Sequence, residues 1–218
     1  MEGNISKKIF KLLEDAKRIV NSSPDESYSM CREAYDISVY NSLLKEEGYS
    51  LLGIAFVYRS KSETANMLET LFKAQEIFDS TGDSMGLIRV YNLMGVAYFY
   101  SFMYDKALSY FLKAKDNLIQ FKDDNLSLSV LNNIGEVYRE SENHDQALNY
   151  YLEAISICDR SGNHNSKAII HGNIGEIYFV KGNYDKALEY FTLSYNQLKN
   201  DNDNISLGEV ENRIGRIH

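Results

Sequence analysis

A fixed spacing of glycine residues is the feature that most limits how this chain of 218 residues can fold. Gly95, Gly135, Gly175 and Gly215 follow one another at intervals of 40 residues, within the segments NLMGVAY, NNIGEVY, GNIGEIY and NRIGRIH. Self-similarity at a period of roughly 20–50 residues is typical of architectures built from stacked structural repeats. The chain is therefore expected to consist of successive copies of one unit.

A second repeated segment follows each of the first three glycines and carries Ala107, Ala147 and Ala187 at the same spacing. In both segments the apolar residues recur every three or four positions, which predicts amphipathic helices. Short polar segments separate the two helices of a unit, and longer ones separate the units. The predicted fold is all-α, with antiparallel helix pairs over 5–40, 42–80, 84–121, 125–160 and 165–200, followed by an unpaired helix over 204–218.

The repeated glycines predict a close approach between the two helices of a pair. Glycine inside a helix costs about 1 kcal/mol relative to alanine, so its recurrence implies a compensating contact. We expect each glycine to meet a small alanine of the second helix, with Tyr98, Tyr138 and Tyr178 filling the space beside it. At the other end of the chain, Ser23–Glu26 is interpreted as a capping box with Pro24 at the first helical position.

These segments resemble the tetratricopeptide repeat, whose pattern has Leu-Gly and an aromatic residue on one helix and Ala, an aromatic residue and Ala on the next. Residues 86–200 match this pattern closely, 42–80 match loosely, and 5–40 match chiefly through Ala34. The 40-residue period is similar to a longer-helix subgroup found in bacterial signalling proteins. The resemblance implies a single domain over 1–218, a right-handed superhelical solenoid whose first helices line a concave groove, and binding as the usual activity.

The last repeat segment stops partway through a first helix, at Arg213–His218. A solenoid terminus normally carries a polar capping helix. We therefore expect either that this is the N-terminal part of a longer protein with a further output domain, or that the end is covered by another copy.

Composition excludes several classes of function. The formal charge is −8, from 23 Lys and Arg against 31 Asp and Glu, which disfavours nucleic-acid binding. No apolar run approaches the roughly 20 residues that cross a bilayer, and the N-terminus does not resemble a secretory signal, so a cytoplasmic protein is expected. Cys31 and Cys158 are interpreted as buried thiols, and the four histidines lack metal-ligand spacing. The sequence contains no catalytic motif, so no enzyme activity, metal or cofactor is expected.

Polar residues on the first helices are the candidate binding site. Asn92, Asn132 and Asn212 share one register, although asparagine is a weak helix former. One interpretation is a ladder of amides that binds an extended peptide, and the alternatives are a hydrophilic face or asparagines that bridge adjacent repeats. The residues predicted to line the groove are Arg89, Asn92, Phe99, Ser129, Asn132, Asn133, Glu136, Arg139, Asn173 and Glu176.

The functional prediction is an interaction domain that binds a peptide or protein segment in this groove, as the regulatory region of a bacterial signalling protein. Because Glu136 and Glu176 face only Arg89 and Arg139, the sequence favours a neutral or modestly basic peptide. The alternatives are a homodimer formed through the terminal helices, or a regulator of a response-regulator or phosphorelay partner.

Overall fold

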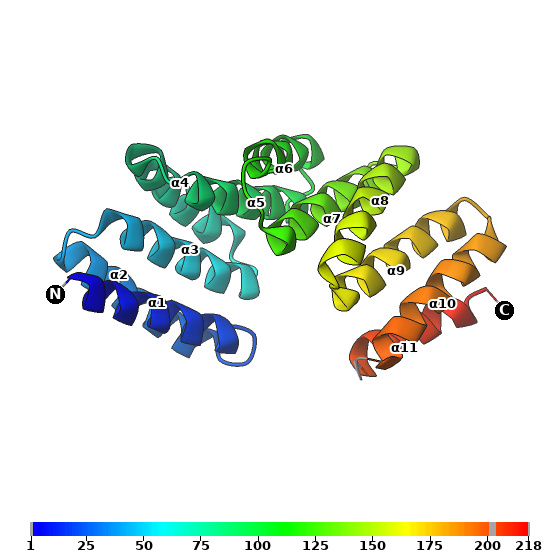
Figure 1. Cartoon of the computed structure of the whole chain (residues 1–218), viewed down its shortest axis with the longest axis horizontal. Helices are drawn as coiled ribbons and strands as arrows, with labels where there is room; N and C mark the ends of the chain where they lie inside the picture. The colour runs from blue at the N-terminus through cyan, green and yellow to red at the C-terminus, as the bar shows by residue number, and fades with distance from the viewer. Residues whose placement is uncertain (1, 201–203, 218) are drawn as a thin grey trace. The chain divides into compact units, whose positions relative to one another are not determined.

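The computed structural model of the chain describes residues 2–200 and 204–217. Every regular element within these ranges is an α-helix, and consecutive helices run as antiparallel pairs (Figure 1). The predicted all-α fold of helix pairs is therefore confirmed. The helices group into two compact units, Met1–Phe121 (unit 1) and Lys122–His218 (unit 2). A single solenoid domain over 1–218 stays a prediction.

Unit 1 contains three helix pairs. Each helix contacts the next along the chain, and the first helices also contact one another across pairs, α1 with α3 and α3 with α5. The first helices therefore form one layer of the unit. The six helices are α1 (Glu2–Ile19), α2 (Pro24–Tyr40), α3 (Leu44–Ser60), α4 (Thr64–Thr81), α5 (Ser84–Tyr100) and α6 (Tyr104–Leu118).

Unit 2 contains two pairs and one further helix. Its first helices α7 and α9 contact each other, and α11 packs on α10. Val210 of α11 is buried in a cluster with Ala187 and Phe191. The five helices are α7 (Asp124–Glu140), α8 (His144–Ser161), α9 (His164–Val180), α10 (Tyr184–Asn200) and α11 (Asn204–Gly215).

Gly95, Gly135 and Gly175 face aromatic rings rather than alanines, so the expected glycine–alanine contact is wrong. A Cβ added at Gly95 would lie 2.5 Å from the ring of Phe111, and one at Gly175 would lie 2.5 Å from the ring of Phe191. Gly135 meets Tyr151 in the same way. Glycine is needed because a ring of the second helix occupies the space of its missing side chain.

Tyrosine pairs lie beside these contacts, as the sequence predicts. Tyr98 stacks on Tyr110, Tyr138 on Tyr150 and Tyr178 on Tyr190, with ring centroids 5.4, 5.5 and 5.6 Å apart. Each stack joins the two helices of one pair, so packing explains much of the tyrosine content.

The turn inside a pair also repeats its backbone conformation. Phe102, Glu142 and Gly182 have φ angles of 58°, 59° and 73°, in the left-handed region. An amide of the following residue closes each turn, as when Asn143 donates to the carbonyl oxygen of Tyr138 at 2.8 Å. The 40-residue register therefore extends to the backbone, even where the side chain is not glycine.

The N-terminal caps of α5, α7 and α9 follow the same register. Asp83 accepts a hydrogen bond from the Gly86 amide at 2.9 Å, and Asp123 and Asn163 cap α7 and α9 similarly. Helix α2 begins at Pro24 as predicted, but the side chain of Ser23 makes no capping hydrogen bond, so the capping box is wrong.

Among the described residues, no helix combines the length and the apolar character that crossing a membrane requires.

Candidate functional site

The residues predicted to bind a peptide lie on three first helices and in both units. Arg89, Asn92 and Phe99 lie on α5 of unit 1, whereas the others lie on α7 and α9 of unit 2. Ser129 is exposed and the rest are half-buried. The structure therefore gives two sets of residues, one in each unit.

In unit 2 the predicted asparagine ladder contains a direct bridge between repeats. The Asn173 side-chain amide of α9 donates to Oδ1 of Asn132 on α7 at 3.1 Å. This contact is the bridging alternative that the sequence left open. Binding of a peptide to these amides stays a prediction, and such a peptide would compete with this hydrogen bond.

The carboxylate of Glu136 is held by two neighbours. It accepts a hydrogen bond from the hydroxyl of Tyr151, the residue whose ring faces Gly135. Its other oxygen accepts from Nη2 of Arg139 at 2.8 Å. Burial and the charge of Glu136 both raise the pKa of Tyr151. Burial alone would lower the pKa of Arg139, but the hydrogen bond and charge of Glu136 raise it. Glu136 is thus an internally paired carboxylate.

Glu176 is paired as well, by Arg213 of α11 and by Arg216, which follows that helix, and the sequence prediction missed both. Nε of Arg213 lies 3.0 Å from Glu176 Oε1, and Nη1 of Arg216 lies 3.9 Å from it. Arg216 also lies over the ring of Phe179, 4.6 Å from its centroid. The 40-residue register gave a signal, because Arg213 and Arg216 occupy the positions of Asn173 and Glu176 in the next repeat. Unit 2 is consequently less acidic on this face than the sequence suggested.

Unit 1 contains an apolar pocket that the sequence prediction also missed. Its volume is about 530 Å³, and its walls come from α1, α2, α3 and α5. Arg89 is the one predicted groove residue among its lining residues. The charged residues at the pocket are Glu14, Lys17 and Arg89. Its remaining lining residues are Phe10, Leu13, Val20, Ser27, Cys31, Tyr49, Leu52, Gly53 and Phe56.

Close packing under this pocket involves Gly53 and Cys31. A Cβ at Gly53 would lie 2.9 Å from Sγ of Cys31 and 3.1 Å from Leu13. Cys31 is 2% exposed, and burial raises the pKa of its thiol to about 11. Cys158 of unit 2 is also buried. Both cysteines are thus the buried thiols that the sequence predicted.

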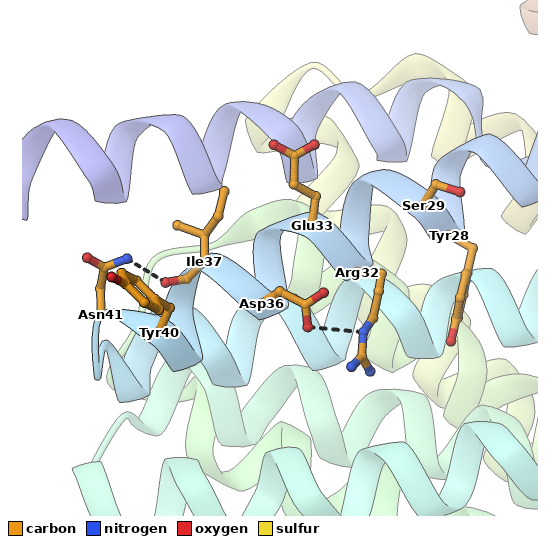
Figure 2. A pocket seen from close by; sticks show the side chains of 8 residues that line it. All are labelled: Tyr28, Ser29, Arg32, Glu33, Asp36, Ile37, Tyr40 and Asn41. Atoms are coloured by element: carbon orange, nitrogen blue, oxygen red, sulfur yellow. Dashed lines mark hydrogen bonds and ion pairs between the residues drawn. The ribbon is translucent and has the colours of Figure 1, made fainter.

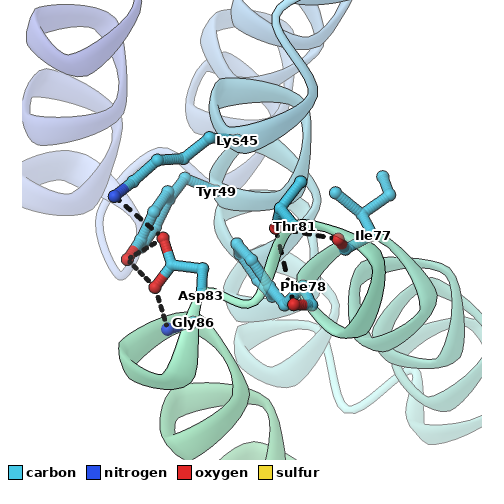
Figure 3. Close-up of polar contacts among 7 residues, drawn as sticks. All are labelled: Lys45, Tyr49, Ile77, Phe78, Thr81, Asp83 and Gly86. Atoms are coloured by element: carbon cyan, nitrogen blue, oxygen red, sulfur yellow. Dashed lines mark hydrogen bonds and ion pairs between the residues drawn. The ribbon is translucent and has the colours of Figure 1, made fainter.

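A junction between α3 and α5 supports the pocket region. Figure 3 shows Lys45 and Tyr49 of α3 directed at Asp83, which also caps α5. Lys45 Nζ lies 2.9 Å from Asp83, and the Tyr49 hydroxyl donates to it at 3.4 Å. Burial and the charge of Asp83 raise the pKa of Tyr49 to about 12. Tyr49 lines the pocket, so this network positions one of its walls.

The outer face of α2 forms a second, shallower hollow (Figure 2). Its side chains bond mostly within the helix, as when Arg32 pairs with Asp36 at 3.1 Å and the Asn41 amide donates to the Ile37 carbonyl at 2.7 Å. Tyr40 is 89% exposed. A hollow on one helix lacks opposing walls, so we do not assign it a ligand.

Chemistry of other kinds has little support in the described residues. They include no group of three His, Cys, Asp or Glu side chains arranged to hold a metal ion. His171 is 7% exposed, and its Nδ1 atom has no hydrogen-bond partner. Burial and then the charge of Lys167 lower its pKa.

Comparison with known proteins now identifies the family. Residues 126–200 match the tetratricopeptide repeat family, and residues 88–116 match it separately. The chain is a tetratricopeptide repeat protein. Solved structures of the same fold include kinesin light chain TPR-like repeats from Podosopora anserina, with a TM-score of 0.70. No curated protein matches the chain by sequence.

Three larger proteins of known structure contain the same arrangement of helices. Aspartyl phosphate phosphatase F from Bacillus subtilis aligns with a TM-score of 0.81 and 19% identity, over 94% of this chain and 54% of its own. BtubC from P. vanneervenii aligns with a TM-score of 0.74 and 15% identity, over 96% of this chain and 82% of its own. A Rap protein complexed with competence and sporulation factor gives a TM-score of 0.73 and 14% identity, over 100% of this chain and 65% of its own. At these identities the likeness is one of fold, and this tetratricopeptide repeat protein spans about half of the phosphatase.

Proposed function

We propose that this tetratricopeptide repeat protein binds a peptide or protein segment on the faces formed by its first helices. The pocket of unit 1 is the observation that carries the proposal. It is concave, largely apolar and bordered by a few charged side chains, which are the features of sites that bury a ligand anchor. An apolar side chain of the bound segment would enter the pocket, and the charged side chains would orient its flanks.

The role we propose is regulatory, in the cytoplasm of a bacterium and as part of a signalling protein. A Rap protein of the same fold has been solved in complex with competence and sporulation factor, which supports this role by analogy. Occupancy of the pocket would favour one arrangement of the first helices, and a partner domain would respond to that arrangement.

The test is to select peptides that bind to the whole chain. Peptides from a displayed random library would be enriched on the wild-type protein and their affinities measured by calorimetry. The matched variant is Phe10→Glu, because Phe10 is 39% exposed at the pocket and its ring packs edge-on against Tyr49, which lines the same pocket. We expect at least ten-fold weaker binding to the variant. Peptides that bind both proteins equally would overturn the pocket as the site.

The amides of unit 2 need a separate test. Replacing Asn132 and Asn173 with Ala removes their bridge and any amide contact with a peptide. If the ladder binds peptides, the affinity of a selected peptide falls several-fold while circular dichroism stays unchanged. Unchanged affinity would leave the two asparagines with a bridging role alone.

A second candidate function is control of a phosphorelay partner. The likeness to aspartyl phosphate phosphatase F favours it, although this chain covers 54% of that protein. The expected result is a complex with a phosphorylated receiver domain that shortens the lifetime of its aspartyl phosphate. Failure of any receiver domain of the same genome to bind would exclude this candidate.

A further inference from the structure

The turn between α5 and α6 exposes an unusual amount of apolar surface. Tyr100, Phe102 and Met103 are 67%, 79% and 49% exposed, and we call these three residues the aromatic turn. Contiguous exposed apolar side chains of this kind mark interaction surfaces in soluble proteins. The corresponding turns of other repeats contain Ser62, Glu142 and Gly182 at the position of Phe102.

Phe102 is unfavourable in two independent ways. Its φ of 58° lies in the left-handed region, which costs an L-residue about 1–2 kcal/mol. Its ring also faces solvent. Glycine, serine or glutamate occupies the same backbone position elsewhere in the chain, so the turn does not need phenylalanine to form. The ring therefore requires an explanation outside the fold.

The size of the aromatic turn indicates how it would be buried. Three such side chains at these exposures offer on the order of 400 Å², since a buried aromatic residue removes about 150–250 Å² from water. A stable interface buries about 800 Å² on each partner. Two aromatic turns that faced each other would bury little beyond these side chains and would fall well short of that area. A concave apolar pocket would enclose the same side chains on several sides and would also contact the residues beside the turn.

Unit 1 itself contains a pocket of that kind, but its own aromatic turn cannot reach it. The pocket reaches Arg89 on α5, and Tyr100 lies eleven residues further along that helix, a distance of about 16 Å. Each side carries an acidic and a basic side chain that could pair across the contact. Exposed Asp105 and Lys106 follow the aromatic turn, whereas exposed Lys17 and Glu14 lie at the pocket.

We infer that the aromatic turn of one molecule inserts into the unit 1 pocket of a second copy of this chain. Phe102 is the anchor, and Lys106 and Asp105 lie opposite Glu14 and Lys17. The contact is head-to-tail, so an assembly keeps a free pocket at one end and a free turn at the other, and it lengthens with concentration. This inference rests on the proposed function, because it names a partner for the same pocket.

The test is sedimentation velocity of the whole chain across concentrations from about 5 to 500 μM. The wild-type protein is expected to shift continuously towards larger species. Phe102→Gly removes the ring and suits the left-handed turn, and Phe10→Glu places a charge at the pocket. Each variant alone is expected to associate at least ten-fold more weakly. Thermal unfolding of Phe102→Gly at or above the wild-type temperature verifies that it is folded.

Mixing the two variants distinguishes this contact from symmetric ones. Phe102→Gly retains an intact pocket and Phe10→Glu an intact turn, so the equimolar mixture is expected to form a dimer and stop there. Association of Phe10→Glu by itself would mean that turns pair with turns, and would overturn the inference. So would a wild-type protein that stays monomeric throughout.

Failure of this inference is separable from failure of the proposed function. Monomeric Phe102→Gly still presents its pocket to the selected peptides. If it binds them while the wild-type protein does not self-associate, the pocket serves another partner and the inference alone is overturned. If neither peptides nor a second copy depends on Phe10, both proposals fall.

Discussion

At the scale of single residues, equivalent positions of different repeats can be compared within the same protein. Glycines that face a ring and glycines that face solvent occur in helices of the same chain. Gly95 would bring a Cβ within 2.5 Å of Phe111, whereas nothing lies within 4 Å of the corresponding point at Gly208 of α11. Left-handed turn positions likewise occur with and without glycine.

Gly95→Ala is expected to destabilise the protein by about 1–3 kcal/mol, because the added methyl group overpacks against the Phe111 ring. Gly208→Ala is the control and should stabilise it by up to about 1 kcal/mol through helix propensity. Urea unfolding measures both. Adding Phe111→Leu to Gly95→Ala should recover part of the loss, and a double variant no better than additive would argue against the proposed clash.

Glu142→Gly is expected to raise the free energy of unfolding by about 0.5 kcal/mol. Relief of the left-handed conformation at φ 59° is offset in part by the greater entropy of glycine in the unfolded chain. Gly182→Ala, at the same turn position, should lower it by about 1 kcal/mol. Thermal unfolding of both variants measures the pair, and changes of the same sign would contradict the argument.

At the scale of helices, caps and buried polar groups connect one element to the next. Asp83 caps α5 and accepts from Lys45 and Tyr49 of α3 (Figure 3). The sequence predicted the helices but not this junction, since helical periodicity fixes which face is apolar and not which side chains of different repeats meet. The bridge from Asn173 to Asn132 was foreseen only as an alternative for the same reason.

Asp83→Ala is expected to destabilise unit 1 by about 1–2 kcal/mol through loss of the cap. Asp83→Asn should lose less, since an amide oxygen caps α9 at Asn163. Burial tends to raise the pKa of Asp83, but the Gly86 amide and Lys45 lower it overall. The charged form therefore stabilises the fold above the unfolded pKa of about 3.9, and this contribution is lost as pH falls through the lower folded value. The difference between wild type and Asp83→Asn should disappear in acid unfolding experiments.

His171 is expected to make unit 2 less stable in mild acid. Burial lowers its pKa, so protonation favours the unfolded chain, and stability declines once pH falls below the unfolded value of about 6.5. The equivalent position one repeat earlier is Leu131, so His171→Leu introduces a residue that this repeat position already accepts. The variant should lose the part of the acid destabilisation that comes from His171. Chemical unfolding at pH 7 and pH 5 measures the effect. An unchanged slope in the variant would assign the acid sensitivity to other groups.

At the scale of the whole molecule, the sequence predicted the helix pairs because the same segments recur every 40 residues. It did not predict the features formed by the first and last segments, which match the repeat pattern only in part. The unit 1 pocket depends on Phe10 and Leu13 of the segment that matches the repeat chiefly through Ala34. Without a register, those residues could not be placed on a face. Arg213 and Arg216 follow the last complete helix pair, and the repeat pattern does not indicate which side chains of the final helix meet the repeat before it, although Arg213 lies 3.0 Å from Glu176.

Repeat arrays transmit a perturbation mainly to adjacent repeats. Gly175→Ala, which would crowd Phe191, is therefore expected to increase amide exchange in α9 and α10 while that of α1 and α2 stays as in the wild type. Hydrogen exchange with mass spectrometry resolves these helices. A uniform increase along the chain would indicate global cooperativity instead.

The hydroxyl of Tyr151 limits how the repeats of this chain can be exchanged with one another or with those of other proteins. Phe111 and Phe191 occupy its register without a hydroxyl, and only the α8 ring donates to a glutamate, Glu136. Exchanging Tyr151 for phenylalanine would strip a half-buried carboxylate of one donor while leaving the ring's shape intact. A repeat grafted from this chain into another array should therefore carry Tyr151 and Glu136 together.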